Sequence, residues 1–274
     1  MMRVLLPFAL AATLLASACG GGSSFPEATG KGSIRAINAV PASPEIGFLI
    51  EERPLGAAAY QNGTALARYD DLSYTFNFEV FYAGEDSSRR IARQNIDVEA
   101  NKIYDLLISG SLANPTVTVW QSDERTFDEA DTVFAAKFSH ASASLGDLDY
   151  YFADPSVEPA LGNQVATLSF GEVSDASDFT EADFVLTVTR AGDPDDVVFT
   201  SDTVTFPARD VFMMTLFDGD SSDTAPYFVR AFSNLGNALA LPDINFSPTV
   251  QFVNASMELS GSDIYDDEML TSLR

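Results

Sequence analysis

Hydrophobic and polar residues alternate with a period of two in many short segments between residues 32 and 233. The clearest example runs from Tyr74 to Val80, where Phe76, Phe78 and Val80 alternate with polar residues. This alternation places the apolar side chains on one face of a β-strand. Gly, Pro, Asn and Asp separate the segments, and helical spacing is nearly absent. The pattern therefore predicts an all-β protein with many short strands.

The strand pattern repeats along the chain, which predicts tandem domains. Three pairs of segments correspond between the copies: 35–39 with 137–141, 74–80 with 182–188, and 104–108 with 212–216. We therefore expect tandem immunoglobulin-like antiparallel β-sandwich domains over 32–122 and 132–233, with a small barrel as the alternative. Residues 251–255 match the first segment a third time. This match predicts an incomplete third repeat, or an extra strand on the second sandwich, over 248–274.

The first residues have the layout of a secretory signal. A single cation, Arg3, precedes an apolar run from Val4 to Leu15, and three small residues then lead to Cys19. The apolar run is shorter than the roughly 20 residues that span a bilayer as a helix. The stretch Leu15 to Cys19 resembles a bacterial lipobox, which implies cleavage after residue 18 and lipidation of Cys19. The Gly/Ser-rich residues that follow predict a flexible tether over 19–31.

Cys19 also bears on the expected cellular location of the chain and on whether it can form a disulfide. It is the only cysteine, so no disulfide can form within the chain. Two or more acyl chains hold a protein firmly at a membrane, and we therefore expect the membrane to be a partner through this anchor. The residue after the cysteine is Gly20. An aspartate at this position would resemble an inner-membrane retention signal, and the chain lacks it. The expected location is the cell envelope, at the outer membrane where the host has two membranes.

The net charge of the chain argues against one class of partner. The formal net charge is -25, with 40 acidic residues against 15 basic ones. A chain this acidic repels phosphate groups, so we expect no nucleic-acid partner. Solubility outside the cell is the simpler explanation of the acidity, and a specific role in cation binding is the alternative.

The repeats resemble a known bacterial family. A short strand ends in Asn-Ala or His-Ala-Ser, a turn and a strand follow, and after an aromatic-rich strand a further strand ends on Gly. Residues 34–44 through Gly110, and 137–142 through Gly219, carry this pattern. It is similar to the family called domain of unknown function 4397. The resemblance implies a β-sandwich domain of exported proteins and carries no activity with it.

Candidate chemistry is sparse, and we expect no enzyme activity, no catalytic residues and no cofactor. His140 is the only histidine, and Asn38 and Asn254 occupy its position in the other copies. What these residue types share is the ability to hydrogen-bond nearby backbone at a strand end, so we expect a structural role. One segment has spacing suited to calcium, through Asp218, Asp220 and Asp223, but it lacks the closing glutamate of an EF-hand and also fits a simple turn.

A set of aromatic residues allows a carbohydrate-stacking surface as an alternative to core packing. Its members are Trp120, Tyr74, Phe76, Phe78, Phe81 and Tyr82. The alternation places Phe76 and Phe78 inside, which leaves Phe81 and Tyr82 as the candidates for exposure. The expected function is a non-catalytic, lipid-anchored envelope protein that serves as a spacer, an adhesion module or a ligand-presenting surface. A glycan- or calcium-binding module of the envelope is the alternative.

Overall fold

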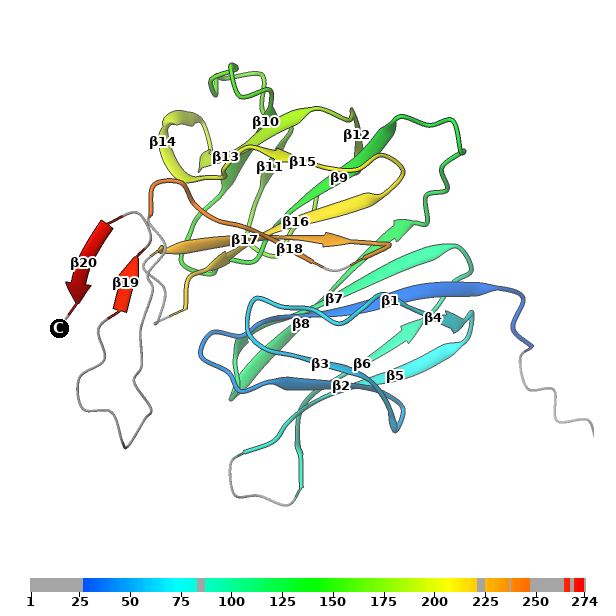
Figure 1. The fold of residues 1–274 in the computed structure, drawn as a ribbon. Coiled ribbons are helices and arrows are strands. Elements are labelled where there is room, and N and C mark those ends of the chain that lie inside the picture. The colour runs from blue at the N-terminus through cyan, green and yellow to red at the C-terminus, as the bar shows by residue number, and fades with distance from the viewer. Residues whose placement is uncertain are drawn as a thin grey trace, which may run out of the picture.

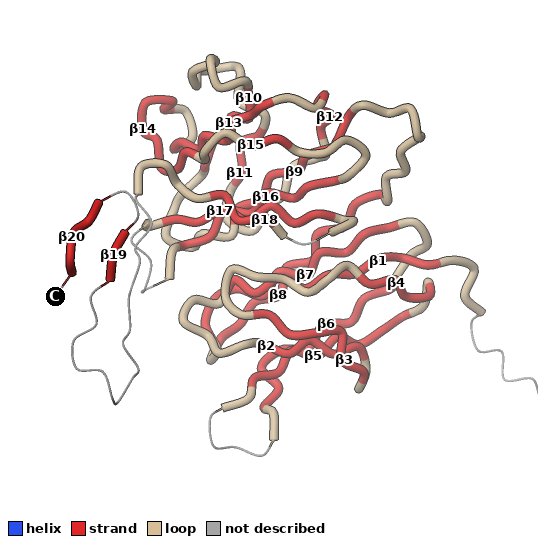
Figure 2. The backbone as a smooth tube through the Cα atoms, viewed as in Figure 1, coloured by secondary structure: helices blue, strands red, loops and turns tan. Residues whose placement is uncertain are grey.

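The computed structural model describes residues 27–82, 87–220, 225–236 and 238–246, and the backbone of 264–266 and 269–273. Every regular element in these ranges is a β-strand (Figures 1 and 2). The prediction of an all-β fold built from β-sandwich domains is therefore confirmed. The predicted signal segment 1–18 and Cys19 lie outside the described residues.

Strands β1 to β8 form the first sandwich. One sheet has the order β4-β1-β7-β8, and we call it the first inner sheet; the other has the order β3-β2-β5-β6 and is the first outer sheet. The strands are β1 (Lys31–Ala39), β2 (Ile46–Ile50), β3 (Arg53–Ala58), β4 (Ala67–Asp70), β5 (Ser73–Val80), β6 (Arg89–Asp97), β7 (Lys102–Ser111) and β8 (Asn114–Asp123). The two sheets enclose one apolar core between them.

The alternation in β5 does what the sequence predicts. Phe76, Phe78 and Val80 are all buried in the first core. The ring of Phe78 meets the edge of Phe48 on β2 at 5.4 Å between centroids, a favourable arrangement for two aromatic rings. A two-residue period therefore sets which face of this strand the core covers.

Strands β9 to β18 repeat the arrangement. The second inner sheet has the order β12-β9-β16-β17-β18, and the second outer sheet has the order β11-β10-β13-β14, with β15 paired to β13. The strands are β9 (Val133–His140), β10 (Leu148–Ala153), β11 (Ala166–Leu168), β12 (Ser177–Thr180), β13 (Asp183–Arg190), β14 (Asp193–Thr200), β15 (Val204–Thr205), β16 (Val211–Asp218), β17 (Tyr227–Ser233) and β18 (Leu239–Leu241). The second core is rich in phenylalanine.

One feature of the pairing differs from the fully antiparallel sandwich that the sequence predicts. β1 pairs with β7 in parallel, and β9 pairs with β16 in the same way. In each sandwich the chain leaves the first strand, forms the outer sheet together with one antiparallel edge strand of the inner sheet, β4 or β12, and then returns to the inner sheet running in the original direction. A parallel neighbour requires such a long crossover, and here the outer sheet supplies it.

The region predicted as a third repeat or an extra strand, 248–274, lies largely outside the described residues. Within it, β19 (Ile264–Asp266) and β20 (Met269–Leu273) pair antiparallel with each other. The strand that extends the second inner sheet beyond β17 is β18, which ends at Leu241.

Candidate functional site

The two inner sheets pack face to face and bury a third hydrophobic cluster between the sandwiches (Figure 1). The four sheets therefore lie in the order outer, inner, inner, outer. The first sandwich contributes Ile37 and Ala39 from β1, Leu107 from β7 and Trp120 from β8. The second contributes Met213 and Phe217 from β16, Phe232 from β17, and Ala141, which directly follows β9. Because β1 and β9 are covered on both faces, nearly all their residues are buried.

The interface has an approximate two-fold symmetry, since equivalent residues of the two copies meet each other. Arg35 on β1 and Lys137 on β9 occupy the same position of the repeat. The Nη1 atom of Arg35 donates to the carbonyl oxygen of Ser233, at the end of β17, over 3.0 Å. The Nζ atom of Lys137 donates to the Oγ atom of Ser122, at the end of β8, also over 3.0 Å. Each cation thus crosses to the other repeat, Arg35 to the end of β17 and Lys137 to the end of β8.

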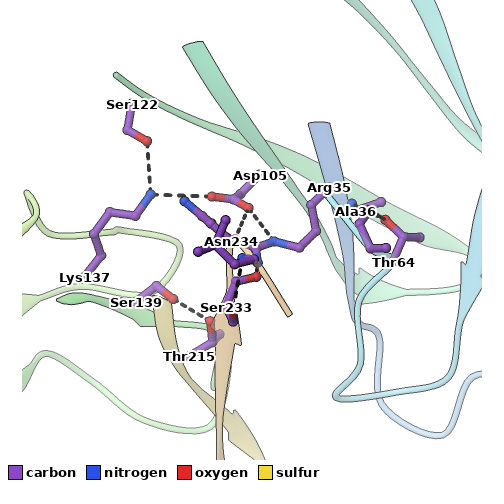
Figure 3. A network of polar contacts seen from close by, with 12 residues as sticks. Arg35, Ala36, Thr64, Asp105, Ser122, Lys137, Ser139, Thr215, Ser233 and Asn234 are labelled. Carbon is purple, nitrogen blue, oxygen red and sulfur yellow. Dashed lines mark hydrogen bonds and ion pairs between the residues drawn. The ribbon is translucent and has the colours of Figure 1, made fainter. Parts of the chain in front are cut away.

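A single carboxylate, Asp105 on β7, lies between these two cations (Figure 3). The Nε atom of Arg35 donates to Asp105 Oδ1 over 2.8 Å, and Lys137 Nζ lies 3.6 Å from Asp105 Oδ2. The side chains of Arg35, Asp105 and Lys137 are 2%, 1% and 6% exposed. The parallel register places Met213 of β16 at the position equivalent to Asp105, so this buried cluster holds two cations and one anion.

Burial dominates the proton affinity of Lys137. It lowers the pKa of the ammonium from its ordinary value, and the nearby charge of Arg35 lowers it further, while Asp105 opposes both effects. Water solvates a charged ammonium better than a protein interior does. The charged form of Lys137 is therefore disfavoured at the interface and depends on Asp105.

Trp120 is part of the interface and does not contribute to an exposed aromatic surface. It is 6% exposed, and its Nε1–H donates to the carbonyl oxygen of Gly171 in the second sandwich over 2.8 Å. Phe232 occupies the equivalent position on β17, as the strand registers show. Of the other aromatic candidates, Phe76 and Phe78 are buried in the first core and Phe81 is 61% exposed. The core-packing interpretation is confirmed for Trp120, Phe76 and Phe78.

His140 has the structural geometry that the sequence predicts. Its Nδ1 atom accepts a hydrogen bond from Ser142 N at 3.3 Å, and its Nε2 atom lies 3.0 Å from the carbonyl oxygen of Gly146. Asn38 forms the equivalent bond to Val40 N at 2.9 Å in the first sandwich. Burial lowers the pKa of His140 below its ordinary value. Both side chains therefore hold the turn after the first strand of the repeat.

The carboxylate of Asp218, a calcium candidate, is hydrogen-bonded to the turn at residues 142–144. It accepts hydrogen bonds from the Oγ of Ser142, the backbone N of Ala143 at 3.0 Å and the Oγ of Ser144 at 2.5 Å. Asp223 lies outside the described residues. Among the described residues, no group of three or more His, Cys, Asp or Glu side chains is arranged to hold a metal ion. These contacts favour the turn interpretation for Asp218.

Two features bear on the membrane and on the tether. The described residues contain no helix that is long and apolar enough to cross a membrane. Near the end of the predicted tether, the backbone N atoms of Thr29 and Gly30 donate to Asp71 Oδ1 at 2.7 and 2.9 Å. The side-chain hydrogen bond from Thr29 is the main cause of a lowered Asp71 pKa. The chain is therefore bound to the first sandwich from Thr29 onward.

The sequence pattern does not identify Arg35, Asp105 and Lys137 as one charged group. A signal was present, because each is a charged residue inside a strand of mostly apolar residues. Such residues are rarely buried unless they are paired. The pairing itself joins residues 70 positions apart in one case, and nothing local in the sequence indicates it.

A family model described as Domain of unknown function (DUF4397) matches residues 32–151, from β1 into β10. No curated protein matches the chain. The match covers the first sandwich, which carries the strand pattern noted in the sequence, and it supports the resemblance of residues 32–151 to the DUF4397 family.

Proposed function

We propose that this protein is a non-catalytic, lipid-anchored component of the bacterial cell envelope, in which two sandwiches form one stiff unit that holds a surface away from the membrane. One observation carries the proposal: the interface between the inner sheets is apolar and encloses the Arg35–Asp105–Lys137 cluster. A surface of this kind is stable only when it is covered.

Separating the two sandwiches costs free energy. Pulling the inner sheets apart exposes eight apolar side chains of the interface cluster and separates Arg35 from Ser233 and Lys137 from Ser122. Apolar area contributes roughly 25 cal/mol per Å² when it is buried. The linker between β8 and β9 is fastened as well, since Arg125 forms a two-pronged ion pair with Asp178 of the second sandwich. Two domains held in this way act as a spacer of fixed geometry.

The anchor part of the proposal is supported by the sequence. The apolar run ends in small residues before Cys19, and Gly/Ser residues follow it. Lipid chains on Cys19 would hold the protein at the membrane, and the flexible stretch would end at Thr29, where Asp71 binds the backbone. The high negative charge of the chain keeps such a unit soluble at the envelope surface.

The experiment expresses the chain and its Cys19→Ser variant in a two-membrane bacterium that is fed a labelled fatty acid. We expect label in the wild-type protein and its recovery with outer-membrane vesicles, and a soluble, unlabelled Cys19→Ser variant. Ser24→Ala, in the same tether, is the matched control and keeps the label. Unlabelled wild-type protein in the soluble fraction would contradict the anchor.

A second measurement tests the stiff unit. Spin labels placed on exposed positions of the two sandwiches, at Ser73 and Asp195, report the distance between them. One narrow distance distribution is expected because the inner sheets do not separate. A broad distribution would show independent domains and would refute the spacer of fixed geometry.

A further inference from the structure

Two cavities border the Arg35–Asp105–Lys137 cluster, one at its Arg35 end and one at its Lys137 end, at positions that the approximate two-fold symmetry relates. The Lys137 cavity has a volume of about 630 Å³ and is lined by residues that include Lys102, Trp120, Ser122, Lys137 and Ser174. The Arg35 cavity has a volume of about 100 Å³ and is lined by residues that include Arg35, Thr64, Phe232 and Ser233. Thr64 and Ser174 are equivalent, since each hydroxyl accepts a hydrogen bond from the first strand of its repeat.

The two ends differ in charge. The position before β16 is Asp210, and its carboxylate accepts hydrogen bonds from Ser233 Oγ at 2.5 Å and Val211 N at 2.7 Å. Ser233 is also the residue whose carbonyl oxygen binds Arg35. The chain therefore supplies a buried carboxylate of its own near the Arg35 end.

The equivalent position at the other end is Lys102, at the start of β7. Lys102 lines the Lys137 cavity together with Arg125. Three cations thus border this cavity in a chain whose net charge is -25. The acids on its lining are Asp123, whose side chain is 85% exposed and which pairs with Lys102 at 2.6 Å, and the exposed Asp175.

The ammonium group of Lys137 has more N–H donors than the hydrogen bond to Ser122 uses. An ammonium has three N–H donors, and one of them meets Ser122 Oγ at 3.0 Å. Asp105 Oδ2 lies 3.6 Å away, which is too far for a hydrogen bond, and this oxygen has no hydrogen-bond partner. A buried cation with unused donors, at the wall of a cavity, is a site at which an anion gains both charge balance and hydrogen bonds.

We propose that the Lys137 cavity binds a small organic molecule with one carboxylate. The carboxylate contacts Lys137 and is attracted by Lys102, and the rest of the molecule lies against Trp120 and Val173, which also line the cavity. The volume is within the range of small-molecule sites. Asp123 and Asp175 disfavour ligands with several negative charges, because like charges repel.

Trp120 makes the proposal easy to test, because it is the only tryptophan of the chain. Benzoate is titrated into the purified protein at constant ionic strength while Trp120 fluorescence is recorded, and benzamide serves as the neutral molecule of the same shape. We expect a saturable change with benzoate and at least a tenfold weaker response to benzamide. Equal responses, no saturation with benzoate, or a response to inorganic phosphate alone would overturn the proposal.

Variants locate the site. Lys102→Met is expected to weaken benzoate binding by about three- to tenfold, since one charge near a ligand contributes on the order of 1 kcal/mol. Lys31→Met is the matched control, because Lys31 also begins a strand and pairs with an aspartate, Asp70, at 2.6 Å, but does not line the cavity. Lys137→Met removes the central contact and is expected to abolish binding. If the Lys137→Met variant does not fold, the Lys102→Met variant still tests the site. An unchanged affinity for benzoate in Lys102→Met would refute the site.

Discussion

Replacing Asp105 with asparagine removes the only carboxylate of the Arg35–Asp105–Lys137 cluster while keeping its size. Arg35 and Lys137 then remain buried, at 2% and 6% side-chain exposure, without the carboxylate that pairs with both of them. Loss of one partner of a buried ion pair destabilises a protein by roughly 3–5 kcal/mol. We therefore expect the free energy of unfolding to fall by about that amount, a large share of the roughly 5–15 kcal/mol of a typical domain.

The assay is equilibrium unfolding in urea, followed by the fluorescence of Trp120 at the interface. Asp70→Asn is the control, because Asp70 pairs with Lys31 on the surface with a side chain that is 47% exposed. Exposed pairs of this kind contribute only about 0–1 kcal/mol. The two variants therefore differ in burial while sharing the same chemical change.

A double variant tests the cause of the loss. In Asp105→Asn with Lys137→Met, one of the two uncompensated cations is absent, so about 1–2 kcal/mol of the loss is expected to return. The Arg35 charge lowers the Lys137 pKa, which shows that the two cations disfavour each other. An Asp105→Asn variant within 1 kcal/mol of the wild type, or a double variant less stable than the single one, would refute this reasoning.

The remaining predictions concern pH, the interface and calcium. Because burial lowers the Lys137 pKa in the folded state, the unfolded chain binds more protons between that lowered pKa and about pH 10.4. Stability in urea unfolding is therefore expected to rise with pH in this window, and Lys137→Met is expected to remove the rise; the same rise in the variant would contradict the assignment. Because the His140 pKa is lowered in the folded state, the free energy of unfolding is expected to decrease as the pH falls below about 6.5. In urea unfolding, His140→Asn is expected to make this decrease smaller, and the same decrease in the variant would contradict the prediction. Trp120→Phe loses the bond to Gly171 and is expected to destabilise by about 1–3 kcal/mol in urea unfolding followed by far-ultraviolet circular dichroism, since the variant has no tryptophan; a loss below about 0.5 kcal/mol would count against the interface. Asp218→Ala is expected to lower the melting temperature through its lost hydrogen bonds, while millimolar calcium leaves the wild type unchanged; a calcium-dependent rise would revive the metal site.

Local pattern was enough to predict much of the fold. The period of two in β5 identified both the strand and its buried face, because neighbouring side chains of a strand point to opposite sides whatever the rest of the chain does. The match between Asn38 and His140 identified their shared role at a turn, since the hydrogen-bonded backbone atoms lie only two residues away. Such interactions are contained in a few consecutive residues.

The interface was decided by the tertiary structure alone. β1 is buried on both faces from Gly32 to Ala39, and a sequence pattern does not say which sheet covers the second face. The parallel pairing of β1 with β7, and the meeting of Asp105 with Lys137, depend on how segments distant in sequence come together. The sequence by itself determined the strands and their repetition because these depend on neighbouring residues. The docking of one repeat on the other followed only from three-dimensional packing, where burial turns three scattered charged residues into one cluster.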